Sequence, residues 1–170
     1  MKKIIPLLLC VFIIVTTFTA LYSYSLGKVN YYISTIKKYS TQSISASMIA
    51  AIIRVESNFD PLARSNKGAI GLMQLLPKTA EYVAQIFKIG YDESDLLDGE
   101  KNIQIGVLYL SYLLDRFSLE WVIVAYNAGE TITKKWIESG VSLNKIPYKE
   151  TRDYYKKVVR AMKLYEFSGY

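Results

Sequence analysis

One glutamate in this chain stands where an acid catalyst could work. Glu56 comes three and four residues after Ile53 and Ile52, so it continues the apolar face of a predicted helix. Burial there raises the pKa of a carboxyl group, and an acid that keeps its proton near neutral pH can act as a general acid. A glutamate at a fraying helix end that points to water fits the same pattern. Both interpretations stay open on this segment alone.

The segment that follows Glu56 carries turn signals and then a polar pair. Asp60 precedes a proline, residues 62–70 are predicted to form a loop, and Met73 and Gln74 come next. This pair can line a cleft beside the carboxylate. Asp60 is four residues beyond Glu56, but the chain is predicted to leave the helix there. We therefore do not expect a second catalytic carboxylate at Asp60.

The residue inventory excludes several kinds of chemistry. The chain has no histidine, which removes Ser-His-Asp and Cys-His arrangements and the common histidine zinc sites. Its single cysteine, Cys10, lies in an apolar run, so an internal disulfide and a cysteine metal cluster are impossible. Residues 92–99 are acidic but lack the ligand spacing of a calcium loop. We expect chemistry that uses carboxylates, hydroxyls and amides, without a metal or cofactor.

Charge and aromatic content bear on the partner. The net charge is +6, and the basic excess falls after residue 133. An anionic partner such as a wall polymer or lipid headgroups fits that excess, as does a solvated helix face. Nothing in the chain resembles a nucleic-acid-binding module, so no nucleic acid is expected. Fifteen tyrosines, within an aromatic content of 14%, suit a cleft that binds sugars, although core packing accounts for many of them.

The N-terminus is predicted to carry a targeting segment. Lys2 and Lys3 precede an apolar run over residues 4–21, which as a helix spans roughly 27 Å, near the hydrocarbon thickness of a bilayer. The flanking lysines favour a single-pass topology with the domain outside the cytoplasm. Cleavage of a signal peptide, best placed after Ser25, would instead give a secreted protein. We favour the uncleaved anchor.

The remaining elements are predicted to be helical. A short helix is expected over residues 28–39, and Ser45 is a suitable N-cap for a helix over residues 46–56. Further helices are predicted over residues 77–87, 102–117, 119–128, 132–139 and 151–167. Residues Ile146 to Tyr148 are predicted to form an extended piece before the last of these helices. No β segment of any length is evident, so the fold class is all-α. The predicted segments are an anchor or signal over residues 1–24, a linker or short helix over residues 25–44, and a catalytic domain over residues 45–170.

Several blocks of the domain resemble a known family. The motifs occur in order from about Ser45 to Val159 and resemble the catalytic domain of soluble lytic transglycosylases; they are Glu56-Ser57-Asn58-Phe59, Ser65, Gly68-Ala69-Ile70-Gly71-Leu72-Met73-Gln74, Asn102-Ile103 with Gly106 and Tyr109, Ala125-Tyr126-Asn127-Ala128-Gly129, and Ile146-Pro147-Tyr148 with Glu150-Thr151-Arg152. This resemblance implies a goose-type lysozyme-like fold. Leu76 departs from the family, in which many members carry methionine at that position.

The resemblance implies a reaction on peptidoglycan glycan strands. A single glutamate, Glu56 by position, protonates the bond between N-acetylmuramic acid and N-acetylglucosamine. It then acts as a base while the 6-hydroxyl of the muramic acid closes a 1,6-anhydro ring. A lysozyme-type hydrolase and a catalytically silent wall-binding or scaffold protein remain alternatives. An anchored enzyme would work on near-membrane glycan, where it could open a gap for an envelope assembly; a monomer is the default.

The resemblance also implies the substrate-binding residues. The predicted set is Ser65, Gly71, Met73, Gln74, Tyr126, Asn127, Tyr148 and Glu150. Ser65 and Gln74 are expected to bond the sugars, and Tyr126 is expected to point at Glu56. Ser57 is expected to bond backbone rather than substrate. Arg152 is expected as the salt-bridge partner of Glu150.

Overall fold

The computed structural model describes residues 4–169 and divides the chain into two compact units, Met1–Ser34 and Thr35–Tyr170. The described residues contain helices and no β-strand, with only isolated bridges in one loop. The prediction of an all-α protein is confirmed for this part of the chain.

The first helix is longer than predicted. α1 runs without a break over Ile4–Tyr39, whereas the sequence predicted an apolar segment and a separate short helix. The stretch between them has one glycine, Gly27, and no proline, and a single glycine costs a helix only about 1 kcal/mol. Searched over the described residues, no helix combines the length and apolarity needed to cross a membrane. The anchor over residues 4–21 stays a prediction.

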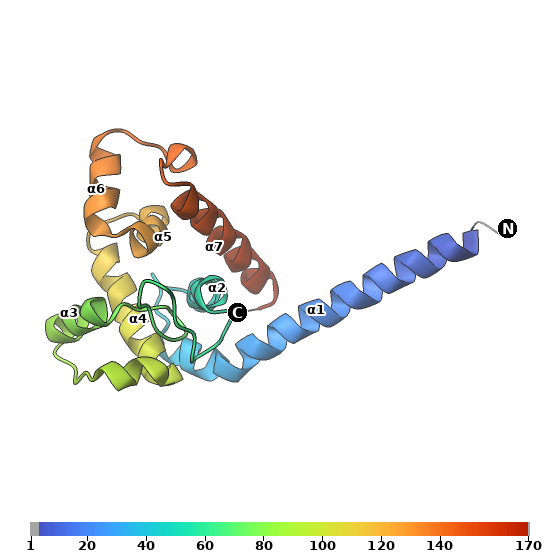
Figure 1. Cartoon of the computed structure of the whole chain (residues 1–170), viewed down its shortest axis with the longest axis horizontal. Helices are drawn as coiled ribbons and strands as arrows, with labels where there is room; N and C mark the ends of the chain where they lie inside the picture. Colours follow the sequence, from blue (N-terminus) through green and yellow to red (C-terminus); the bar gives the residue numbers. More distant parts are fainter. Residues whose placement is uncertain (1–3, 170) are drawn as a thin grey trace. The chain divides into compact units, whose positions relative to one another are not determined.

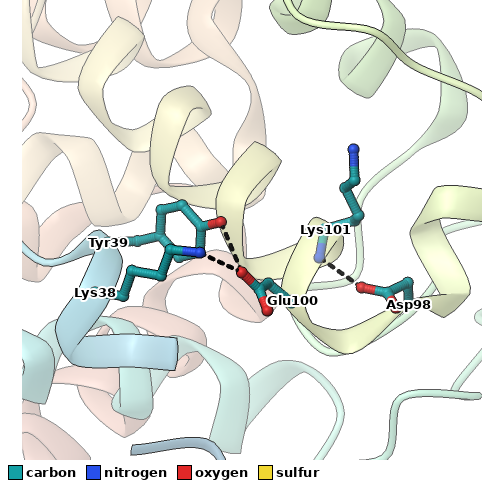
Figure 2. Close-up of polar contacts among 5 residues, drawn as sticks. All are labelled: Lys38, Tyr39, Asp98, Glu100 and Lys101. Carbon is teal, nitrogen blue, oxygen red and sulfur yellow. Dashed lines mark hydrogen bonds and ion pairs between the residues drawn. The ribbon is translucent and has the colours of Figure 1, made fainter. Parts of the chain in front are cut away.

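The last turn of α1, which belongs to the second unit, is fixed to the start of α4 (Gly99–Leu114). Figure 2 shows Glu100 accepting from Lys38 Nζ at 2.6 Å and from the Tyr39 hydroxyl at 3.1 Å. Asp98 caps the same helix by accepting from the backbone N–H of Lys101 at 2.8 Å. This cap explains why α4 begins three residues before its predicted start at residue 102.

The helix that carries Glu56 lies at the centre of the second unit (Figure 1). α2 spans Ala46–Glu56, and the predicted N-cap is confirmed, because Ser45 Oγ accepts from the N–H of Met48 at 3.2 Å. Residues 47–53 are buried, and α2 packs mainly against α7 (Lys149–Phe167). Glu56 is therefore the end of a helix that the core holds on most sides.

The other helices complete the unit around α2. They are α3 (Pro77–Phe87), the 3₁₀ turn η1 (Glu93–Leu97), α5 (Leu119–Ala128), α6 (Glu130–Glu138) and the 3₁₀ turn η2 (Leu143–Lys145). α4 packs between α3 and α5, and α5 contacts α6 and α7. Apart from the helix over residues 28–39, which is merged into α1, the predicted helices are present with ends that shift by up to three residues.

The segment between α2 and α3 is a folded loop that Asn102 of α4 holds in place. The Asn102 side chain is fully buried; its Oδ1 accepts from the N–H of Met73 at 2.8 Å. Its Nδ2 donates to the carbonyls of Ile70 at 3.0 Å and Leu96 at 2.9 Å. Gly71 has φ of 80°, and a Cβ there would lie 2.2 Å from Asn102 Nδ2, so only glycine fits.

Candidate active site

Glu56 has the protonation behaviour that an acid catalyst needs. Its pKa is raised from 4.5 to about 7, mainly by burial and also by the negative charge of Glu150, while the Tyr154 hydroxyl acts in the opposite direction. The carboxyl group is thus divided between its protonated and ionised forms at neutral pH. A group in that state can give up a proton and take one back.

A cavity of about 360 Å³ opens beside Glu56. Five of the residues predicted to bind substrate line it together with Glu56: Ser65, Gln74, Tyr126, Asn127 and Glu150. Lys67, Leu76, Thr79 and Tyr109 also contribute to its walls. The cavity therefore brings together residues from the loop after α2 and from α3, α4, α5 and α7.

Three predicted residues lie outside the lining of this cavity. Met73 is fully buried and Gly71 is buried against Asn102, so both shape the loop from behind. Tyr148 is 54% exposed, and its ring meets Trp136 edge to face at 5.0 Å. The motifs that contain these three residues do contribute other side chains to the cavity, but these three do not line it.

The polar side chains of the loop form hydrogen bonds with backbone groups. Gln74 Nε2 donates to the carbonyls of Ala63 at 3.1 Å and Gly71 at 2.9 Å. Ser65 Oγ accepts from the N–H of Ala69 at 3.0 Å. Ser57 Oγ donates to the Leu72 carbonyl at 2.7 Å, which confirms the prediction that Ser57 bonds backbone. These bonds fix the loop that faces Glu56.

Two tyrosines enclose Glu56 from other helices. The Tyr126 hydroxyl donates to the Met73 carbonyl at 2.7 Å, and burial raises the pKa of Tyr126 well above 10. Tyr154 of α7 is buried, and its hydroxyl has no hydrogen bond of ordinary geometry within residues 4–169. It nonetheless lies close enough to Glu56 to lower the pKa of that carboxyl group.

Sequence reasoning missed Tyr154. It belongs to the buried stripe of α7, with Thr151, Val158 and Ala161, so it looks like an ordinary core residue. Its position four residues after Glu150, on the same helix, was the one available signal. The sequence could not show that this core position faces Glu56.

Glu150 stands at the open side of the cavity and is 73% exposed. Its carboxylate lies 3.5 Å from Lys67 Nζ. The prediction that Arg152 pairs with Glu150 is wrong, because the guanidinium of Arg152 donates to the carbonyls of Ile146 and Pro147. Those bonds hold the segment before α7 against the first turn of that helix. Across the described ranges, no cluster of three or more His, Cys, Asp or Glu side chains could hold a metal.

Comparison with known proteins places this geometry in a family. The model of the transglycosylase SLT domain matches residues 33–148. The chain belongs to this family. The soluble lytic murein transglycosylase of Escherichia coli K12 is 38% identical over 135 residues, which are 72% of this chain and 21% of that protein. The membrane-bound lytic murein transglycosylase C of Haemophilus ducreyi is 30% identical over 79% of this chain and 45% of its own length.

Solved structures agree with this assignment. The 70 kDa soluble lytic transglycosylase of Escherichia coli matches with a TM-score of 0.76 and 35% identity, over 80% of this chain and 24% of that one. An inactive mutant of the lytic transglycosylase Slt of Pseudomonas aeruginosa, in which a glutamate is replaced by glutamine, matches with a TM-score of 0.75 and 32% identity over 79% of this chain and 24% of that one. The SLT-family, lysozyme-like fold inferred from the motifs is confirmed. The chain spans about a fifth of the length of the soluble relatives.

Proposed function

We propose that this SLT domain is a peptidoglycan lytic transglycosylase in which Glu56 is first the acid and then the base. The observation that carries the proposal is a carboxyl group, with a pKa that burial raises to about 7, at the wall of a cavity lined by hydroxyl, amide and aromatic side chains. Pockets of this composition suit sugars, which present hydroxyl and acetamido groups together with apolar ring faces.

The reaction needs only one carboxyl group. Glu56 gives its proton to the glycosidic oxygen, and the bond from that oxygen to C1 of N-acetylmuramic acid breaks with its electron pair on the oxygen. The Glu56 carboxylate then takes the proton of the 6-hydroxyl, whose oxygen bonds to C1. A 1,6-anhydro ring and a free 4-hydroxyl result, Glu56 is protonated again, and water takes no part.

The surroundings of Glu56 support this use of one carboxylate. Asp60 is exposed, and its Oδ1 accepts from the N–H of Leu62 at 2.9 Å, as in a structural turn. Glu150 is the other carboxylate in the cavity, where it is exposed and paired with Lys67. Among the residues that line this cavity, Glu150 is thus the group that could serve a lysozyme-type hydrolase as a second carboxylate, and the two mechanisms differ in their products.

The relatives support the same assignment. Those reported above are named lytic murein transglycosylases, and one solved relative is inactive with glutamine in place of a glutamate. Because the family includes proteins named membrane-bound, we extend the proposal to wall glycan near a membrane, with residues 4–21 as the anchor and residues 45–170 as the catalytic domain.

Fragment release from purified peptidoglycan tests this proposal. The full chain is expected to release fragments that end in 1,6-anhydromuramic acid, and the Glu56→Gln variant is expected to release none. Asp60→Asn serves as the matched control, because it removes a carboxylate near in sequence that we do not place in the reaction. Binding of glycan without release by the wild-type chain would favour a silent wall-binding protein.

A further inference from the structure

Aromatic side chains continue from the cavity along α4. Tyr109 lines the cavity, and its ring stacks on that of Tyr112, with centroids 6.3 Å apart and planes at 20°. Tyr82 of α3 meets Tyr112 nearly edge to face at 5.6 Å. Tyr112 is buried, but Tyr82 is 49% exposed. The three rings therefore form a path from the cavity to the surface.

Elements that line the cavity also carry this path. Thr79, Tyr109 and Gly129 line the cavity. Tyr82 lies about one helical turn after Thr79, Tyr112 lies about one turn after Tyr109, and Glu130 directly follows Gly129. A second hollow of about 450 Å³ starts at Glu130 and continues along α6. Tyr82, Tyr112 and Glu130 thus each follow a residue that lines the cavity.

Polar groups are ordered on this surface. The Glu130 carboxylate accepts from the Tyr112 hydroxyl at 2.8 Å and lies 3.4 Å from Arg116 Nε. The Arg116 guanidinium lies over the Tyr112 ring, 3.7 Å from its centroid, and donates to the Tyr112 carbonyl at 2.8 Å. The side chains of Arg116 and Glu130 each remain 39% exposed. Their positions are thus set before any ligand arrives.

Stability alone does not account for this arrangement. A half-exposed ion pair contributes about 1 kcal/mol or less, and the exposed Tyr82 ring leaves apolar area in water. What the surface offers is an aromatic ring beside a carboxylate and a guanidinium, all partly open. A saccharide ring has matching parts, namely an apolar face and a rim of hydroxyl and acetamido groups.

We infer that Tyr82, Arg116 and Glu130 form a further sugar subsite, which holds an N-acetylhexosamine of the glycan strand beyond the sugars next to Glu56. Tyr82 packs on the apolar face of that sugar, and Arg116 and Glu130 bond its polar rim. The inference rests on the proposed function, since it assumes that the cavity binds glycan. It adds that strand length contributes to binding at the end of the cavity near α3 and α6.

Calorimetric titration with β-1,4-linked N-acetylglucosamine oligomers tests the subsite. The full chain with Glu56→Gln is used, so that binding is measured without turnover, and the oligomers range from the dimer to the hexamer. The affinity is expected to rise with length. Adding Tyr82→Ala is expected to leave the affinity for the shortest binding oligomers unchanged. It is expected to weaken the affinity for the longest oligomers about five- to tenfold, which is the effect of losing one modest contact.

Three further variants sharpen the result. Tyr82→Phe keeps the ring and is expected to retain most of the affinity, and Arg116→Gln is expected to weaken the long oligomers as Tyr82→Ala does. Phe167→Ala removes another exposed ring, 89% exposed on α7, and is expected to change nothing. Equal affinity of the Tyr82→Ala protein and its parent for every oligomer would overturn the subsite while leaving the proposed function intact. No binding of any oligomer, together with no fragment release by the wild-type chain, would overturn both.

Discussion

The loop after α2 and the start of α7 face the same cavity but are built differently. The loop is held by buried contacts, chiefly the three hydrogen bonds of Asn102. The start of α7 presents the exposed residues Tyr148 and Glu150, and the Lys67 ammonium is the ion-pair partner of Glu150 within the described chain. The difference indicates that the core fixes the surroundings of Glu56, whereas the polar groups at the start of α7 stay open to solvent.

The largest expected effect comes from breaking the buried side of this comparison. Asn102→Ala leaves the N–H of Met73 and the carbonyl of Leu96 without their partner, while the Ile70 carbonyl keeps its hydrogen bond from the N–H of Leu75 at 3.1 Å. Because each unpaired buried group costs about 1–3 kcal/mol, we expect the free energy of unfolding to fall by about 3 kcal/mol or more. Urea unfolding measures this. The exposed Asn144→Ala is the control, and equal midpoints for both variants would contradict this account of the loop.

The second effect concerns the cost of keeping Glu56 buried. Its pKa is about 7 in the folded chain and near 4.5 when unfolded, so the folded state holds the proton over a pH range in which the unfolded state has lost it. Stability is therefore lost as the pH rises from about 4.5 to about 7. Glu56→Gln removes this loss and is expected to raise the free energy of unfolding by about 3 kcal/mol above pH 7.

Urea unfolding at several pH values checks this expectation. The gain from Glu56→Gln should shrink as the pH falls from about 7 to about 4.5 and be nearly absent below 4.5. Glu81→Gln, on the exposed face of α3, is the control and should show no such gain. A gain that is the same at every pH would mean that burial of the Glu56 charge is not its source.

A smaller effect is expected from the hydroxyl that faces Glu56. Tyr154→Phe removes a group that lowers the pKa of Glu56, so the pKa should rise further and the pH profile of fragment release should move to higher pH. Stability should change little, since the hydroxyl makes no ordinary hydrogen bond to described residues. Tyr155→Phe, the next residue on α7, is the control. A lower rate without a change in the pH profile would mean that Tyr154 acts only through packing.

The smallest effect is expected at the exposed rim. Lys67→Gln breaks the 3.5 Å ion pair with Glu150, in which both side chains are more than 70% exposed. Exposed pairs contribute little, so the free energy of unfolding should change by less than about 0.5 kcal/mol. Thermal unfolding measures it. A loss as large as that of Asn102→Ala would remove the distinction between the two regions.

The sequence predicted what depends on local pattern. The helix over residues 46–56 was predicted with its Ser45 cap, and the apolar period placed Glu56 on the apolar face but left a buried and a solvent-facing carboxylate both open. Contacts between distant segments were not visible. Asn102 bonds Met73 across 29 positions, Tyr154 looks like a core residue of an amphipathic helix, and Gly106 leaves space that Met73 fills, since a Cβ there would lie 2.3 Å from the Met73 sulfur.

The central claim is that the 6-hydroxyl of the muramic acid closes the ring, with Glu56 as acid and base and without water. Isotope labelling tests this claim most directly. Peptidoglycan is digested by the full chain in water enriched in ¹⁸O, and the fragments are analysed by mass spectrometry. The account predicts 1,6-anhydromuramoyl ends that carry no ¹⁸O at C1 and that disappear with Glu56→Gln. Reducing ends that carry ¹⁸O would contradict it and would point to hydrolysis with Glu150 as the second carboxylate.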